Sequence, residues 1–153
     1  MLKFQAERFA DTMAEMIPLM GEHFDEVGLN AAPFPVQPNF ASYFTMERAG
    51  SLHLFTARAE DDALAGYSAF ILAPDLIYGG HAVAMNHALY LRRQYRNGFT
   101  VKRLIRFGER EMAAKGAEIF EYHLWSDHNF GRLMELVGYE ERRITFSKFA
   151  RKE

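Results

Sequence analysis

The sequence contains no cysteine, and this absence removes several kinds of chemistry. Disulfide bonds, zinc sites built from thiolates and a cysteine nucleophile are all excluded. The charges nearly cancel as well, because 18 Lys and Arg residues stand against 20 Asp and Glu residues. A nearly neutral chain has no overall field that would attract nucleic acid or an anionic membrane. We therefore expect neither of these as a partner.

Long apolar runs are also missing. No stretch approaches the roughly 20 consecutive apolar residues that a membrane-spanning helix needs. The N-terminal sequence MLKFQAERFADTM alternates charged and apolar residues, so it predicts neither a secretory signal nor an anchor. These features favour a cytoplasmic protein. There is no repeat and no linker rich in Pro, Gly or Ser, so we expect residues 1–153 to form a single domain.

The apolar residues that are present follow helix and strand periods in turn. A short strand is predicted over Leu2–Glu7, and a helix from Phe9 that Pro18 bends or splits and that Gly28 and Asn30 end. The Pro-rich segment AAPFPVQPNF (31–40) is expected to be an extended loop, after which Asn39 caps a short helix that ends at Gly50.

The second part of the chain reads as strands with two helices between them. SLHLFTARA (51–59) and ALAGYSAFIL (63–72) predict an antiparallel hairpin, and HAVAMNHALYL (81–91) predicts a further strand. A helix over Thr100–Lys115, the strand EIFEYHLW (118–125), a short helix ending at Gly138 and the strand RRITFSKF (142–149) follow. The order predicts a mixed α/β fold in which helices cover one layer of sheet.

The turn between HALYL and the second long helix is a candidate anion site. The first amides of a helix have no partner within it, and the helix dipole adds positive charge there. Phe99, Thr100 and Val101 can therefore donate to a phosphate, although Gly98 is the only glycine of this turn. We also expect an unusual backbone conformation at Gly98. Strand–turn–helix units are common, so a plain connection explains this turn equally well.

A resemblance covers most of the chain. Residues Leu89–Leu104, LYLRRQYRNGFTVKRL, resemble the acetyl-CoA signature of the GNAT N-acetyltransferase superfamily. Counted from Arg96, the two small residues of that signature are replaced by Phe99 and Val101. Tyr-Arg-x-Gly at 95–98 is similar to a divergent branch found in phages and prophages. The hairpin GSLHLFTAR/LAGYSAFIL, the stretch HFDEVG (23–28) and the closing NFGRLMELVGYEERRITFSKF resemble the superfamily in the same order.

This resemblance implies a central mixed, mostly antiparallel sheet flanked by helices, with two parallel strands that splay apart. The strands would be HAVAMNHALYL and EIFEYHLW, with the pantetheine arm of acetyl-CoA between them. Backbone groups near Leu89 and Leu91 would pair with that arm, while the amides of 97–102 would hold the diphosphate. The cofactor-binding residues that it implies are Leu89, Leu91, Arg96, Asn97, Gly98, Phe99, Thr100, Val101, Lys102 and Asn129.

Three residues are candidates for the catalytic chemistry. His87 titrates near neutrality and could take the proton of an ammonium substrate; by strand alternation it shares a face with Met85 and Leu89. His23 and Glu26 lie where the superfamily often builds its acceptor pocket. A structural role is an alternative for each of them.

Other polar residues are weaker candidates. His123 and the cluster Ser126, Asp127 and His128 follow the next strand, but three consecutive side chains diverge and do not imply a nucleophilic triad. The position of the tyrosine that serves as general acid in the superfamily holds Met134. The histidines have no metal-ligand spacing, so no metal site is predicted.

The resemblance implies an acyl-CoA-dependent N-acetyltransferase that moves an acetyl group from acetyl-CoA to a primary amine of a small molecule or peptide. The alternative is an inactive or weakly active GNAT-like module that binds CoA or a protein, for example a phage accessory protein. Phe99, Val101 and Met134 favour this alternative, whereas His87 and the amide-bearing turn favour the enzyme. Because the last strand of the superfamily often pairs with another subunit, the resemblance is compatible with a homodimer.

Overall fold

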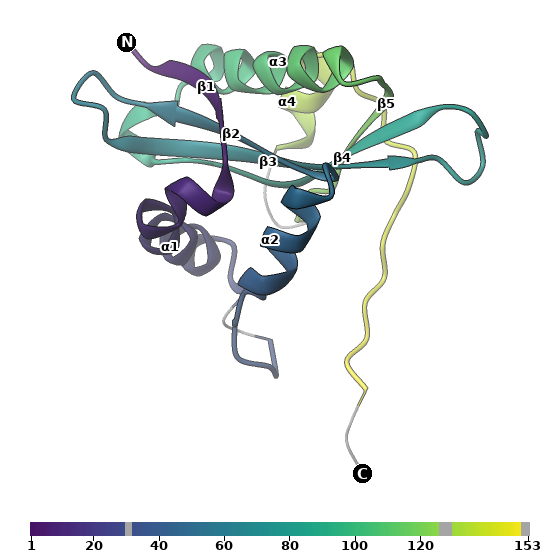
Figure 1. Cartoon of the computed structure of the whole chain (residues 1–153), viewed down its shortest axis with the longest axis horizontal. Helices are drawn as coiled ribbons and strands as arrows, with labels where there is room; N and C mark the ends of the chain where they lie inside the picture. Colours follow the sequence, from purple (N-terminus) through teal and green to yellow (C-terminus); the bar gives the residue numbers. More distant parts are fainter. Residues whose placement is uncertain (30–31, 126–129, 151–153) are drawn as a thin grey trace.

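A five-stranded sheet forms the centre of the protein (Figure 1). The computed structural model describes residues 1–29, 32–125 and 130–150. The strands lie side by side in chain order: β1 (Lys3–Glu7), β2 (Leu52–Arg58), β3 (Leu64–Pro74), β4 (Ala82–Leu91) and β5 (Ala117–Tyr122). All neighbours are antiparallel except β4 and β5, which are parallel.

Helices cover both faces of this sheet (Figure 1). The helices α1 (Phe9–Glu26) and α2 (Phe40–Arg48) lie on one face, and α3 (Gly98–Ala114) and α4 (Gly131–Leu136) lie on the other. A short 3-10 helix, η2 (Arg93–Tyr95), joins β4 to α3. The predicted mixed α/β fold is confirmed. None of the helices in the described ranges combines the length and apolar composition that crossing a membrane requires.

The helix α1 continues through Pro18, so of the two predicted effects, a bend or a split, the split does not occur. A proline inside a helix removes one backbone hydrogen bond and costs about 3 kcal/mol. The stripe of Phe9, Met16 and Leu19 is buried in the core, and burial of this stripe offsets that cost. As predicted, the helix ends before Gly28, whose φ is +72°. Asn30, the second expected stop residue, lies outside the described residues.

Two asparagine caps set the starts of α2 and α3. The predicted cap of α2 is confirmed, because Oδ1 of Asn39 accepts a hydrogen bond from the amide of Ser42 at 3.1 Å. Oδ1 of Asn97 accepts from the amide of Thr100 at 2.8 Å, and this cap starts α3 at Gly98 rather than at Thr100.

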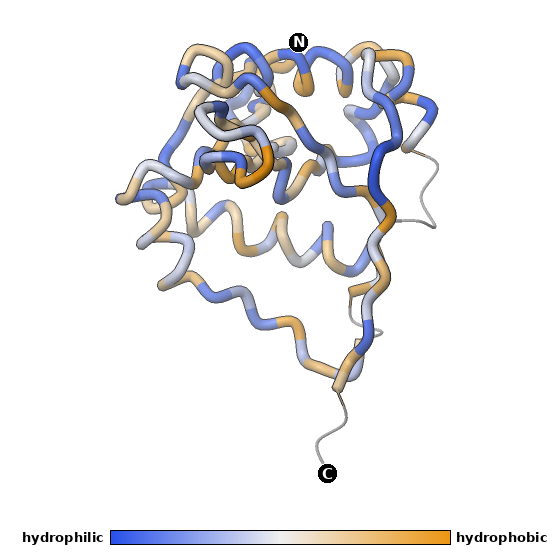
Figure 2. Tube along the Cα trace, turned by 90° about the vertical axis from the view of Figure 1, so that its right-hand side faces the viewer, coloured by the Kyte–Doolittle hydropathy of each residue, from blue (hydrophilic) through white to orange (hydrophobic). Residues whose placement is uncertain are grey.

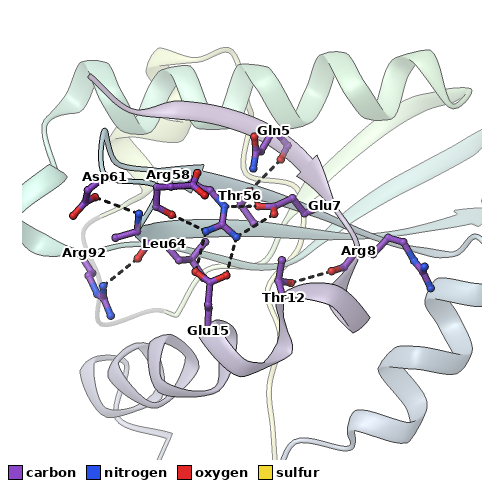
Figure 3. A network of polar contacts seen from close by, with 12 residues as sticks. Gln5, Glu7, Arg8, Thr12, Glu15, Thr56, Arg58, Asp61, Leu64 and Arg92 are labelled. Atoms are coloured by element: carbon purple, nitrogen blue, oxygen red, sulfur yellow. Dashed lines mark hydrogen bonds and ion pairs between the residues drawn. The ribbon is translucent and has the colours of Figure 1, made fainter.

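A polar network links α1 to the strands β1 and β2 of the sheet (Figure 3). Arg58 on β2 donates to both carboxylate oxygens of Glu7 at 3.0 Å and to those of Glu15 at 2.9 and 3.0 Å. It also donates to the backbone carbonyl of Asp62 at 2.7 Å. The side chain of Arg58 is only 7% exposed, so these bonds replace the water that burial removes.

The predicted closing strand over 142–149 is wrong. Residues 140–150 are exposed and form no strand, and the segment extends away from the sheet on the side of α1 and α2 (Figure 1). Figure 2 shows hydrophilic and hydrophobic residues alternating along it. The alternation predicts a strand only where a neighbouring strand pairs with the backbone and a core covers one face. Here Phe146 is 93% exposed, and neither condition is met.

Candidate active site

The parallel strands β4 and β5 lie at one edge of the sheet and separate partway along β4. Their pairing runs from Ala82 and Ala117 to Asn86 and Tyr122. Strand β5 then ends, whereas β4 continues to Leu91 paired only with β3. The expected splayed pair is therefore present, and the edge of β4 beyond Asn86 has no β5 residue opposite it.

A β-bulge lies at the point of separation. Ala69 of β3 pairs with Ala88, while the next residue, Phe70, pairs with Asn86, so His87 is an extra residue in β4. The side-chain nitrogen Nδ2 of Asn86 stabilises this bulge by donating to the backbone carbonyl oxygens of Ala69 and Ala88, both at 3.2 Å. The same nitrogen lies 3.1 Å from the hydroxyl of Ser68.

The bulge changes which side chains share a face. Directly paired residues point to the same side of a sheet. Leu89 pairs with Ser68, and Ser68 contacts Asn86, so these residues lie on the α3 side. His87 instead contacts α2 on the other side. The expectation that His87 and Leu89 share a face is therefore wrong, because simple alternation fails at a bulge.

A cavity of about 280 Å³ opens beneath the bulge, between the sheet and the helices α1 and α2. Its walls are mostly apolar and include Phe9, Met16, Met20, Phe24, Leu54 and Ala88. The loop before α2 contributes Val36, Gln37 and Pro38, and Trp125 contributes from the end of β5. The polar groups are His87, Tyr43, His23, Tyr67 and Gln37. The structure thus brings two of the three predicted catalytic residues to one cavity.

His87 forms a pair with a tyrosine of α2. Nε2 of His87 lies 2.9 Å from the hydroxyl of Tyr43, and the two rings meet edge to face. The side chain of His87 is exposed to solvent in part, and partial desolvation by the cavity walls lowers its pKa, while burial raises the pKa of Tyr43. At neutral pH the imidazole is therefore uncharged and able to accept a proton.

His23 is part of the cavity wall. It is 8% exposed, and its Nδ1 lies 2.6 Å from the hydroxyl of Tyr67 on β3. The ring of Tyr90 stacks on the imidazole at a centroid distance of 4.8 Å. Burial raises the pKa of Tyr67, so this tyrosine stays protonated. These contacts orient His23 tightly within the packed layer between α1 and the sheet.

Glu26 is placed differently from the two histidines. Its carboxylate receives two hydrogen bonds from Arg96, at 2.5 and 2.8 Å, and these bonds hold the pKa of Glu26 below its usual value. Arg92 makes a similar bidentate pair with Glu22, at 2.7 and 2.9 Å. Glu26 therefore links the end of α1 to the turn after β4, and it does not line the cavity.

The start of α3 carries the amides that the sequence assigned to a diphosphate. Those of Gly98 and Phe99 have no acceptor in the described part of the chain, whereas that of Thr100 is capped by Asn97. No positive φ occurs at Gly98, so the expected unusual backbone there is wrong. The space beside it is open, because no atom lies within 4 Å of a Cβ built there.

The side chains around this turn differ in their availability. Phe99 is 71% exposed and lies away from the core, which leaves the adjacent amides accessible. Val101 instead packs against the cluster that contains Leu91. Arg96 is committed to Glu26 and also donates to the carbonyl of Leu91 at 2.5 Å. Lys102 has no ion pair within the described residues.

Sequence reasoning missed the tyrosines that partner the site. Tyr43 contacts His87, and Tyr67 contacts His23. Each pair is 44 residues apart in the chain, and no local sequence pattern predicts contacts at that separation. Tyr122 was also missed. Among the described residues, no group forms a hydrogen bond of normal geometry with its buried hydroxyl, and Tyr122 is the residue where the pairing of β4 and β5 ends.

The remaining candidates lie elsewhere. His123 is exposed and 3.7 Å from Glu121, and Met134 is buried in α4. Ser126, Asp127, His128 and Asn129 lie outside the described residues. Across residues 1–29, 32–125 and 130–150, no three His, Cys, Asp or Glu side chains gather as metal ligands would.

Comparisons with known proteins bear on this arrangement. No family model matches the chain, and no curated protein sequence does. Among solved structures, an aminoglycoside acetyltransferase from an uncultured soil metagenomic sample, in complex with sisomicin, is similar with a TM-score of 0.76 at 15% identity. The alignment covers 98% of this chain and 97% of that one.

Two further solved structures agree. Glucosamine-6-phosphate N-acetyltransferase from Arabidopsis thaliana has a TM-score of 0.72 at 13% identity, with 97% of this chain and 98% of that chain covered. AAC(6')-Iy, in complex with the bisubstrate analogue CoA-S-monomethyl-acetylneamine, has a TM-score of 0.70 at 16% identity, with 98% and 99% covered. None of these structures is described as a phage protein, so they give no support to the phage branch. At these identities the comparison establishes the fold, and the chain has the GNAT fold shared by these acetyltransferases.

Proposed function

We propose that the protein is an N-acetyltransferase that moves an acetyl group from acetyl-CoA to a primary amine. One observation carries this proposal. The bulge in β4 places His87, hydrogen-bonded to Tyr43, in a cavity at the point where β4 and β5 separate. A strand opening, unpaired amides at the start of α3 and a histidine in a cavity on the other face of β4 are features that acetyl transfer from a thioester can use.

The residues at the start of α3 suit a diphosphate. The amides of Gly98 and Phe99 lack acceptors, and the space beside Gly98 is open. The helix dipole adds to the attraction of these amides for an anion. Lys102 adds a positive charge that no described carboxylate neutralises. Acetyl-CoA, when bound, would supply the activated acetyl thioester.

The pair of His87 and Tyr43 would take the proton that the amine loses. If Tyr43 donates to Nε2, the tyrosine oxygen accepts the proton of the amine and passes its own proton to the imidazole. In the other tautomer, Nε2–H donates to Tyr43 and Nδ1 accepts the proton directly. Either route leaves a neutral amine to attack the thioester carbonyl. Glu26 has a lowered pKa and an arginine partner, so we assign it to holding the turn rather than to proton transfer.

A binding module without catalysis is the second candidate function. Asn97 occupies the amide of Thr100, and Arg96 is neutralised by Glu26, so the turn offers less to a diphosphate than its sequence implies. Met134 also provides no proton for a leaving thiolate.

Calorimetric titration with acetyl-CoA, followed by an assay of thiol release with a panel of primary amines, tests the proposal. Binding together with thiol release from at least one amine supports the enzyme. Binding without turnover across the panel would replace it with the module. Absence of binding would overturn both.

A further inference from the structure

We infer that the acceptor is a compact apolar amine whose amino group is its only charged group, such as an arylalkylamine. This inference rests on the proposed function and specifies its acceptor. It comes from the composition, the charge and the size of the cavity beneath the bulge of β4.

The composition of the cavity favours an apolar ligand. Aromatic, methionine and aliphatic side chains from α1, the loop before α2 and β3 form most of its surface. Burial of apolar ligand surface against such walls is the main source of affinity in sites of this kind. Hydroxyl-rich acceptors would lose hydrogen bonds to water without regaining them here.

The charge of the cavity limits the acceptor to one amine. Among the lining residues in the described part of the chain, none is Asp, Glu, Lys or Arg. Its histidine beside Tyr43 is neutral near pH 7, because burial lowers the pKa of His87. An acceptor with two or more ammonium groups would bury charge with no carboxylate to compensate it, and a phosphorylated acceptor would find no cation. With a single amine, the one positive charge passes with the proton to the imidazole of His87, whose side chain is partly exposed to solvent, so the cavity has no second charge to hold.

The size of the cavity sets a further limit. A cavity of about 150 Å³ lined by aliphatic and aromatic residues holds benzene. The volume of about 280 Å³ found here leaves space for one aromatic ring and a short chain. Of the two histidine–tyrosine pairs in this cavity, His23 and Tyr67 are buried and bonded to each other, whereas His87 and Tyr43 are more exposed, so we assign the amine to His87 and Tyr43.

Competition between amines tests the inference. With acetyl-CoA saturating, we expect kcat/KM for phenethylamine to exceed the values for spermidine and glucosamine 6-phosphate at least about tenfold, the discrimination that a few apolar contacts supply. Calorimetry with 2-phenylethanol, which lacks the amine, should show binding to the protein without any reaction. Equal or higher kcat/KM for spermidine or the phosphosugar would overturn the inference.

A matched pair of variants locates the binding. Val27, the residue that follows α1, lines the cavity, whereas Ile17 lies on the exposed side of α1. Val27→Phe should fill the cavity, lower kcat/KM for phenethylamine about tenfold and weaken 2-phenylethanol binding, while the Kd for acetyl-CoA is unchanged. Ile17→Phe should change kcat/KM for phenethylamine, the affinity for 2-phenylethanol and the Kd for acetyl-CoA by less than twofold. If both variants behave alike toward 2-phenylethanol, the ligand does not occupy this cavity and the inference fails.

These measurements separate the inference from the proposed function. If no amine releases thiol, the proposed function fails, whatever 2-phenylethanol does. If thiol release is best with a polycationic amine, the enzyme stands and the assignment of its acceptor is wrong.

Discussion

The hydroxyl of Tyr43 lies 2.9 Å from Nε2 of His87, which joins α2 to the bulge of β4 by one hydrogen bond. Within the described residues, neither side chain has a carboxylate as a hydrogen-bond partner, so the pair is uncharged when the imidazole is neutral. The chemistry that we assign to this pair can be tested by substitution.

We expect His87→Ala to lower kcat about 100-fold, because a positioned general base contributes about that much or more. Tyr43→Phe should lower kcat about tenfold, since it removes the partner and leaves the imidazole. The Kd for acetyl-CoA, measured by calorimetry, should change less than twofold in both. His123→Ala serves as the control, because that histidine is exposed and outside the cavity. Equal losses of turnover and of acetyl-CoA affinity in His87→Ala would indicate a structural histidine.

The pH dependence of kcat/KM should also depend on His87. Burial lowers its pKa below the ordinary value of 6.5, so the neutral form persists to a lower pH in the folded protein. The acidic limb of the profile should therefore have its midpoint below pH 6.5. The same shift contributes stability that is complete above pH 6.5 and is lost as the pH falls through the lowered pKa. A limb centred at pH 7 or above would contradict this assignment.

Gly98→Val should weaken acetyl-CoA binding about tenfold, even though the backbone at Gly98 is ordinary. The branched side chain would occupy the open space beside the unpaired amides, where the ligand has to approach. Calorimetry gives the Kd. Gly79→Val is the control, because Gly79 also has open space around it but lies in the loop between β3 and β4. An unchanged Kd for Gly98→Val would show that the diphosphate binds elsewhere.

Removal of the buried guanidinium should be costly to stability. Arg58→Met leaves the carboxylates of Glu7 and Glu15 without their main partner, so the free energy of unfolding should fall by about 3 kcal/mol. Denaturation by urea measures this change. Arg8→Met should change it by less than about 0.5 kcal/mol, because Arg8 has only an exposed contact with Asp11 at 3.9 Å. Similar effects of the two substitutions would mean that the network does not stabilise the fold.

Tyr122→Phe should not destabilise the protein. Within the described residues the hydroxyl of Tyr122 is buried and makes no hydrogen bond of normal geometry, although Ser68 lies near it, and burial raises the pKa of the phenol. Removal of an unsatisfied polar group is neutral or stabilising by about 1 kcal/mol. The control is Tyr139→Phe, because the hydroxyl of Tyr139 donates to Glu109 at 2.7 Å. Urea denaturation of the two variants compares their free energies of unfolding. A loss larger for Tyr122→Phe than for Tyr139→Phe would reveal a partner for this hydroxyl.

Local signals in the sequence predicted much of the fold. The cap at Asn39 and the stop at Gly28 depend on a few neighbouring residues, so they could be read directly. The hairpin of β2 and β3 was recognisable because apolar residues fill two strands on either side of the turn at Asp61 and Asp62. The resemblance to GNAT supplied the splayed strands, which no residue pattern alone implies.

Features that depend on distant contacts could not be read. Alternation along 81–91 gives no sign of the extra residue at His87, because a bulge is set by pairing with β3. Arg96 pairs with Glu26, which is 70 residues away in the chain. The sequence therefore did not show that Glu26 engages the guanidinium that we had expected to bind a diphosphate. The strand predicted over 142–149 failed for the same reason, since its alternation required a neighbour that the described fold does not supply.

The bulge of β4 reverses parity along one strand. Ala84 packs on the α3 side, whereas Ala88 and Tyr90, which are also even-numbered, pack with the core beneath α1. If one residue were deleted at the bulge, odd and even positions would face the same two sides of the sheet along the whole strand. Either the histidine or the residues after it would then face the opposite side. A gapless alignment of this strand with a regular one would therefore match every downstream side chain to the wrong environment.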